Sequence, residues 1–529
     1  MILSVHRGVP FINTPLQRGV AGVRNLYNRF NGFRATEKTV ETVSGLPMTS
    51  HTLLKQGVNE KQRAYLLGVI AVFISGLLLA GCAVGPNFHP PKTETSPAFA
   101  NGAQTNLASE VLATAWWRGF NDALLNSLIE QAQSSNLDLR IATARVREAR
   151  ALRGYAVADA FPVVNGVAGY TKSTSSKDSV PFPLTREQRQ LELYNVGFDA
   201  TWELDIFGRV RRSVEASSAE VGIAEASRQD VLLTLTAEIA RNYFELRGQQ
   251  NGLAVAFTNA ENQRETVELT TAKFKAGRAT ELDTARARAQ HESTLAVIPP
   301  VEAAIKHSIY RLSVLTGQQP AALEPTLTPS APIPGAPPLV NIADPGSLLR
   351  RRPDIRAAEF ALAAATARIG VATADLFPRV FFNGNLGFSA NQLSGLGKSG
   401  SDTYSFGPQI TWAALDLGHV RARIQAAHAR ADGELASYEK TVLNALEETE
   451  NALVDFGREQ ARRDYLRSSA RSASEATNLA LQRYEGGVSD FLPVLDAQRT
   501  QLDVEAQLAV SETRAATSLV AVYKALGGL

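Results

Sequence analysis

The chain has 529 residues and carries 54 lysines and arginines against 52 aspartates and glutamates, a formal net charge of +2. This balance argues against a dedicated nucleic-acid partner, and the single cysteine excludes a disulfide framework and a cysteine-based zinc cluster. The sequence contains no HExxH, GxSxG or GxxxxGK[ST] motif, so it predicts neither an enzyme nor a protein that holds a metal or another cofactor.

The first predicted element is a secretory signal. Residues 64–80 form a predominantly apolar run that follows basic residues, which is typical of a signal peptide. The run ends in Leu79-Ala80-Gly81-Cys82, a pattern that resembles the bacterial lipobox, in which the cysteine is acylated and becomes the new N-terminus. A membrane anchor that ends in a small buried cysteine is the alternative. Ala83 replaces the aspartate that retains lipoproteins in the inner membrane, so this resemblance implies the outer membrane.

Signal peptides are short, yet residues 1–47 precede this one. We therefore interpret residues 1–47 as a non-native upstream extension, with Met48 as the true start. Residues 48–81 are then the lipoprotein signal peptide, and residues 82–115 are an extended, lipidated N-terminal segment. A peptide from residues 1–47 found in cells would contradict this interpretation.

The rest of the chain contains two copies of one unit, residues 116–318 and 347–529. The segment KFKAGRATELDTARARAQ at position 273 returns as RYEGGVSDFLPVLDAQR at 483, and two other segments return at a similar spacing of about 210 residues. Each copy predicts a helix, two strands, a very long helix and a further helix. The Pro-rich stretch between them, residues 319–346, is expected to be a linker without a helix.

The second strand of each copy alternates apolar and polar residues, which predicts a strand with two different faces. The aromatic and aliphatic residues on the apolar face are Tyr194, Phe198, Trp202, Phe406, Ile410 and Trp412. Their aromatic character and the Gly-rich polar face favour a membrane barrel, with these six side chains towards lipid. An ordinary β-sandwich strand with one solvent-exposed face is the alternative.

Two strands in each copy give four for the chain, and four strands cannot close a barrel. Common membrane barrels begin at eight strands, so strands that enter a membrane require several copies of the chain, and three copies would supply twelve. The long helices, from Gly208 to Lys275 and from Gly418 to Tyr484, contain no proline. Each would extend about 100 Å, which implies coiled-coil packing.

Several motifs occur in an order that resembles one protein family. They are CAVGPNFHPP after the lipobox, the pair Trp116-Trp117, ARNYFELRGQQ at 240, RRRPDIRAAE at 350, ADLFPR at 374, GGVSDFLPVLDAQR and the terminal YKALGG. Together they resemble the TolC-like and OprM-like outer-membrane efflux proteins, in particular the lipidated members that serve RND-type pumps. The resemblance covers residues 82–527.

This resemblance implies a mainly α-helical trimer without catalytic activity. Twelve strands would form one barrel in the outer membrane, and long helices would continue it as a tunnel across the periplasm. The tunnel would dock on a periplasmic adaptor and an inner-membrane RND-type pump, and would passively conduct small molecules to the exterior. A water-filled tunnel discriminates weakly among the molecules that it conducts, so drugs, metals, solvents and signalling oligosaccharides are all compatible with the sequence.

The turns that follow the long helices correspond in the family to the periplasmic tips of the tunnel. In the first turn Thr280 and Asp283 fit a capping box, which is the simplest role for Asp283. The resemblance also makes Asp283 a candidate gate residue, because it can supply a charge near the aperture.

In the second turn the resemblance places Asp496 on the inner face of the aperture. Leu492 and Arg499 lie on the same helix face, because residues three and four apart are neighbours. Three copies would form a ring of leucines and a ring of carboxylates. A solvated Asp–Arg pair is the alternative. Pro493 stands where some members carry a second aspartate, so a second acidic ring is lost.

A lipid-anchored periplasmic coiled-coil adaptor or scaffold is the alternative function. It would share the lipobox and the long helices. It would not require alternating strands that end in tryptophan, nor two copies of them.

Overall fold

The computed structural model describes residues 83–94, 96–102, 107–108, 115–179, 182–337, 340–342 and 344–528. All of the described residues belong to one compact unit of the chain. The predicted upstream extension, the signal peptide and Cys82 therefore lie outside the described residues.

The same order of elements occurs in both halves of this unit. The first half contains α3 (Leu137–Ala158), β2 (Val163–Thr174), β3 (Gln190–Leu204), α4 (Arg209–Lys275) and α5 (Glu281–Leu315). The second half contains α8 (Pro353–Ala374), β5 (Arg379–Ala390), β6 (Asp402–Thr411), α9 (Leu417–Glu485) and α10 (Leu492–Ala525). Shorter elements are β1 (Leu107–Ala108), η1 (Trp116–Phe120), α2 (Ala123–Ser135), η2 (Lys177–Ser179), α6 (Glu324–Leu327), β4 (Val340–Asn341), α7 (Pro345–Arg351) and η3 (Leu393–Gly395).

The long helices α4 and α9 have 67 and 69 residues, close to the predicted bounds. α4 begins where the Asp205 carboxylate accepts hydrogen bonds from the Val210 and Arg211 backbone N–H groups. It packs against α3, α5, α8 and α10, whereas α9 packs against α8 and α10. By length and composition α8 could cross a membrane, and it packs along α4 and α9.

The largest apolar core lies where η1 and α2 meet α4 and α10. Trp116 stacks on Tyr523 with ring centroids 4.8 Å apart, and Phe120 lies 4.8 Å from Phe244. Burial of these aromatic rings stabilises the core, because each ring removes a large apolar area from water.

The Pro-rich stretch differs from the expectation of a helix-free linker. It forms the short helix α6, whose Leu327 is fully buried. Two buried side chains of α4 hold this stretch: Arg247 donates to the Pro329 carbonyl at 2.9 Å, and Gln250 donates to the Leu327 carbonyl at 2.8 Å. These bonds satisfy carbonyl groups that would be costly to bury unpaired, so a helical turn docks instead of a free linker.

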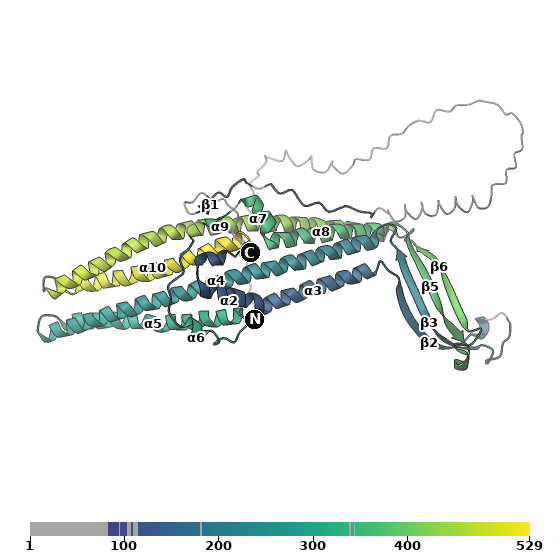
Figure 1. The fold of residues 1–529 in the computed structure, drawn as a ribbon, viewed down its shortest axis with the longest axis horizontal. Coiled ribbons are helices and arrows are strands. Elements are labelled where there is room, and N and C mark those ends of the chain that lie inside the picture. The colour runs from purple at the N-terminus through teal and green to yellow at the C-terminus, as the bar shows by residue number, and fades with distance from the viewer. Residues whose placement is uncertain are drawn as a thin grey trace, which may run out of the picture. The chain divides into compact units, whose positions relative to one another are not determined.

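The four long strands form one antiparallel sheet in the order β2-β3-β5-β6, which leaves β2 and β6 as its edges. Register pairs Phe198 with Leu386, and Leu386 with Tyr404, so these side chains share one face. Figure 1 shows the sheet at one end of the long helices α4 and α9, and the α4–α5 and α9–α10 turns at their other end.

Candidate functional site

One face of the sheet is apolar across all four strands. Phe198, Phe406 and Ile410 are 62%, 72% and 67% exposed, and Tyr194 lies against Tyr170 with ring centroids 4.7 Å apart. Such a large exposed apolar surface is unusual for a protein in water and is typical of a face that contacts lipid or a partner. The six residues predicted to face lipid therefore lie together, although Trp412 follows the last residue of β6.

Trp202 and Trp412 mark the junction between the sheet and the helices. The Trp202 indole donates to the Ala160 carbonyl at 2.9 Å, and the Trp412 indole donates to the Leu376 carbonyl at 3.0 Å. Each acceptor lies in the short connection between a helix and the first strand of its half. An apolar ring with a satisfied N–H suits the boundary between lipid and water.

The opposite face of the sheet is polar and rich in glycine. Asn383 donates to the Gln409 side chain at 2.6 Å. Gly197 of β3 pairs with Gly387 of β5 at the centre of the sheet, where the first half meets the second. A Cβ at Gly197 would lie 2.5 Å from the Leu386 carbonyl oxygen, so only glycine permits this close approach of the two strands.

The far ends of the helices form two tips. Gly277 after α4 and Gly487 after α9 have positive φ angles of 68° and 74°, which favour glycine. The predicted capping box is present: Asp283 accepts from the Thr280 backbone N–H at 3.0 Å and from its hydroxyl at 2.7 Å. The Asp283 carboxylate is therefore engaged within its own helix.

The three candidate gate residues of α10 do not all point together. Leu492, 48% exposed, begins the helix, and Asp496 is exposed one turn later. Arg499 instead donates to the Gln290 side chain of α5 at 2.8 Å. Within the part of the chain that the structure describes, no ion pair joins Asp496 to Arg499. Pro493 lies in the first turn of α10, where proline is tolerated.

The comparisons with known proteins agree with this geometry. A family model described as "Outer membrane efflux protein" matches residues 128–318 and 345–528. The chain belongs to this family. It is 35% identical over 435 residues to Nodulation protein T of Rhizobium leguminosarum bv. trifolii, which covers 82% of this chain and 91% of that protein. It is 32% identical over 475 residues to outer membrane protein OprJ of Pseudomonas aeruginosa, covering 87% and 95%.

A solved structure of the outer-membrane channel OprN matches with a TM-score of 0.80 and 43% identity, over 85% of this chain and 99% of that chain. The resemblance inferred from the sequence is confirmed. This outer membrane efflux protein is the exit duct of an efflux pump and extends from the outer membrane into the periplasm.

Sequence reasoning missed the contacts that join the two tips of the efflux protein. The Lys273 ammonium group at the end of α4 donates to the Tyr484 and Glu485 carbonyls at the end of α9, and lies 4.2 Å from the centre of the Tyr484 ring. Burial, and then the charge of Asp283, raise the pKa of Tyr484 above its usual value. The sequence does place a basic residue shortly before each tip turn. That pattern does not identify the group that the basic residue contacts.

A second contact between the two helix pairs lies further from the tips. Gln498 of α10 donates to the Thr266 hydroxyl of α4 at 2.8 Å, and both side chains are buried. Phe491, Val494 and Leu495 pack beside it in a small apolar cluster. The first helix pair, α4 and α5, is thus bound to the second, α9 and α10, by polar bonds as well as by apolar contact.

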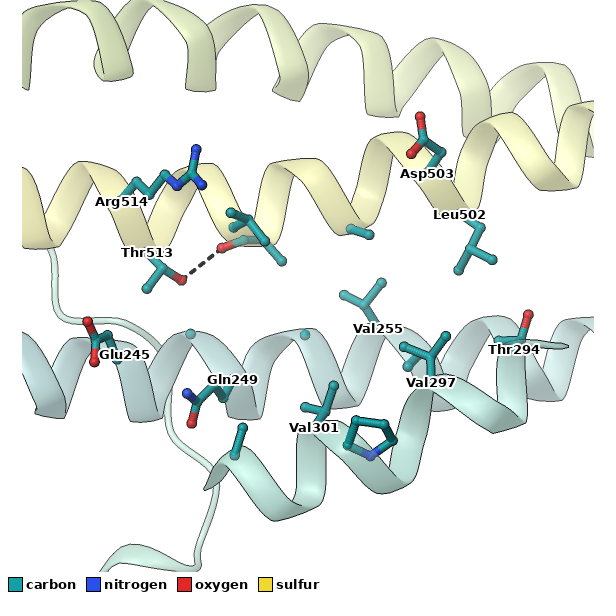
Figure 2. Close-up of a pocket in the computed structure, with 18 of the residues that line it drawn as sticks. Glu245, Gln249, Val255, Thr294, Val297, Val301, Leu502, Asp503, Thr513 and Arg514 are labelled. Carbon is teal, nitrogen blue, oxygen red and sulfur yellow. Dashed lines mark hydrogen bonds between the residues drawn. The ribbon is translucent and has the colours of Figure 1, made fainter. Parts of the chain in front are cut away.

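A groove with a volume of about 740 Å³ lies between α4, α5 and α10. Figure 2 shows apolar side chains such as Val255, Val297 and Leu502 pointing into it, with Asp503 and Arg514 on α10 near its margin. Among the residues that the structure describes, no group of three or more His, Cys, Asp or Glu side chains could hold a metal.

Proposed function

We propose that three copies of this efflux protein form one duct, with a twelve-stranded barrel in the outer membrane and a helical tunnel in the periplasm. One observation carries the proposal: a four-stranded sheet with a continuous exposed apolar face and two edge strands, β2 and β6. Open edges cannot remain unpaired in lipid, so β6 of one copy pairs with β2 of the next until the barrel closes.

The central glycine pair supports closure. Strands that approach as closely as Gly197 and Gly387 do allow a sheet to bend sharply, and barrels use glycine for such bends. The polar face that carries these glycines then lines the water-filled interior. The repeated order of elements in both halves supports an internal duplication that supplies two hairpins for each copy.

The tips of the tunnel form its periplasmic gate. In a trimer Leu492 and Asp496 form successive rings at the aperture, since both are exposed and one helical turn apart. An acidic ring favours cations. Arg499 joins α10, which carries the rings, to Gln290 of α5, and Asp283 caps the start of α5 beside it.

Acylation of Cys82 anchors the mature chain to the outer membrane, and the tips dock on a periplasmic adaptor and an RND-type pump. A coiled-coil scaffold is the less favoured alternative, because it would leave the apolar face of the sheet in water.

The test is conductance of the detergent-purified protein in planar bilayers. Wild-type protein is expected to produce discrete, stepwise currents. The control variant Phe198→Asp/Leu386→Asp places two charges on the lipid face and is expected to insert poorly, since a charge in the bilayer core is costly. Folded wild-type protein that inserts but yields no discrete currents would overturn the proposal.

A further inference from the structure

Arg212, in the first turns of α4, is buried to 4% exposure and donates to the main chain of a distant segment. Its Nε donates to the Val84 carbonyl at 3.1 Å, and its Nη2 donates to the Gly85 carbonyl at 3.2 Å and to the Asn87 side chain at 2.8 Å. Glu215 accepts from Nη1 at 2.7 Å and balances the charge. A buried arginine that uses its donors in this way forms a specific site, because an unpaired one would be strongly destabilising.

Glycines make room for the segment on both sides. Gly85 has φ +89°, and a Cβ there would lie 2.5 Å from the Gly370 Cα of α8. Gly208, before α4, has φ +81°, and a Cβ there would lie 2.5 Å from the Ala83 Cα. The Val84 N–H also donates to the Phe207 carbonyl at 3.1 Å. The N-terminal clamp, Arg212 with Gly85, Gly208 and Gly370, therefore holds residues 83–87 by shape as well as by hydrogen bonds.

The N-terminal clamp lies at the junction of helices and sheet. β3 ends at Leu204 and α4 begins at Arg209, so Phe207 and Gly208 belong to the connection itself. Phe207 stacks on Phe377 of the connection between α8 and β5, with ring centroids 4.6 Å apart. From there the segment continues along α9, where the Ala100 N–H donates to Glu450 at 2.7 Å.

We propose that Arg212 is a positioning residue for the lipid anchor. The N-terminal clamp fixes Ala83 where the four-stranded sheet meets the helices, so that acyl chains on the adjacent Cys82 enter lipid beside the strands. This inference rests on the acylation of Cys82 proposed above. Several acyl chains hold a protein at a membrane, but a flexible segment before the fold would leave open where beside the barrel they enter the lipid. The clamp removes that freedom, because the chain is fixed to both α4 and α8 one residue after the anchor.

The test is hydrogen exchange of the peptide 83–92 in the detergent-solubilised, full mature protein. The Val84 amide is expected to exchange slowly in the wild type and faster by about tenfold or more in Arg212→Ala. Arg212→Lys is expected to lose most of the protection too, because a single ammonium group cannot replace the guanidinium fork. Arg368→Ala is the matched control, since Arg368 joins α8 to Glu220 of α4 without contacting residues 83–87.

Gly85→Ala provides a second route, because it expels the segment while leaving Arg212 intact. It should raise exchange in the same peptide, and the double variant with Arg212→Ala should add no further change. Unchanged protection of Val84 in both single variants, or equal loss of protection throughout α4, would overturn the positioning role. The mass of the N-terminal peptide reports acylation separately: an unacylated Cys82 would overturn the anchor, whatever the exchange result.

Discussion

The glycine pair at the centre of the sheet leads to a quantitative prediction for Gly197→Ala. The new methyl group would lie 2.5 Å from the Leu386 carbonyl oxygen and 2.8 Å from the Gly387 Cα. Both atoms belong to backbone, so β3 and β5 must separate. Overpacking of this kind costs about 1–3 kcal/mol, and the lower entropy of the unfolded alanine chain offsets about 0.4–1 kcal/mol of it.

Gly384→Ala is the matched control. Gly384 lies in β5 between two paired neighbours, but a Cβ there would meet only ordinary contacts at 3.8 Å. This variant should be unchanged or slightly stabilised, by less than about 1 kcal/mol. The two variants should therefore differ by about 2 kcal/mol, a factor of about 30 in the unfolding equilibrium.

The assay is urea unfolding in lipid vesicles, scored by the shift between folded and unfolded bands on unheated gels. Gly197→Ala combined with Gly387→Ala should cost more than the sum of the two single changes, because two methyl groups would then face each other. If Gly197→Ala and Gly384→Ala unfold at the same urea concentration, the close approach of the two strands is not a constraint on this sheet.

Three further predictions concern the tips and the helical region. Asp496→Ala should raise single-channel conductance in planar bilayers by loosening the aperture; unchanged conductance would make Asp496 a surface residue. Lys273→Met should also raise conductance, because it removes the donor to the Tyr484 and Glu485 carbonyls, whereas Lys275→Met, at an exposed position, should not. Burial, and then the charge of Asp354, raise the pKa of Asp230 above its ordinary 3.8, so the folded state binds this proton more tightly than the unfolded state and loses stability as pH rises above about 4. Asp230→Asn should therefore raise the thermal midpoint at pH 7.5, with a difference that shrinks towards pH 4; equal midpoints at pH 7.5 would contradict this.

Local patterns allowed much of the fold to be predicted from the sequence. Alternation with period two identified the apolar face that contains Phe198 and Ile410, because strand geometry alone sets which residues share a face. The long proline-free stretches gave the bounds of α4 and α9, and the spacing of Thr280 and Asp283 gave a cap, because both depend on nearby residues.

Contacts between distant segments could not be predicted in this way. Arg212 meets Val84 and Arg247 meets Pro329 through side-chain bonds to backbone carbonyls, which leave no pattern in composition or spacing. Arg499 was expected to share a face with Asp496, but its long side chain reaches Gln290 of the neighbouring helix. Helix-face arguments give the direction of a Cβ, and a flexible arginine can depart from it when a buried partner is available.

The protein mass of the detergent-purified mature chain, measured by light scattering with the detergent contribution subtracted, tests the proposed duct most directly. A closed twelve-stranded barrel requires three times the mass of one mature chain. The mass of a single chain would contradict the duct, because β2 and β6 would then have no partners for their outer edges in lipid.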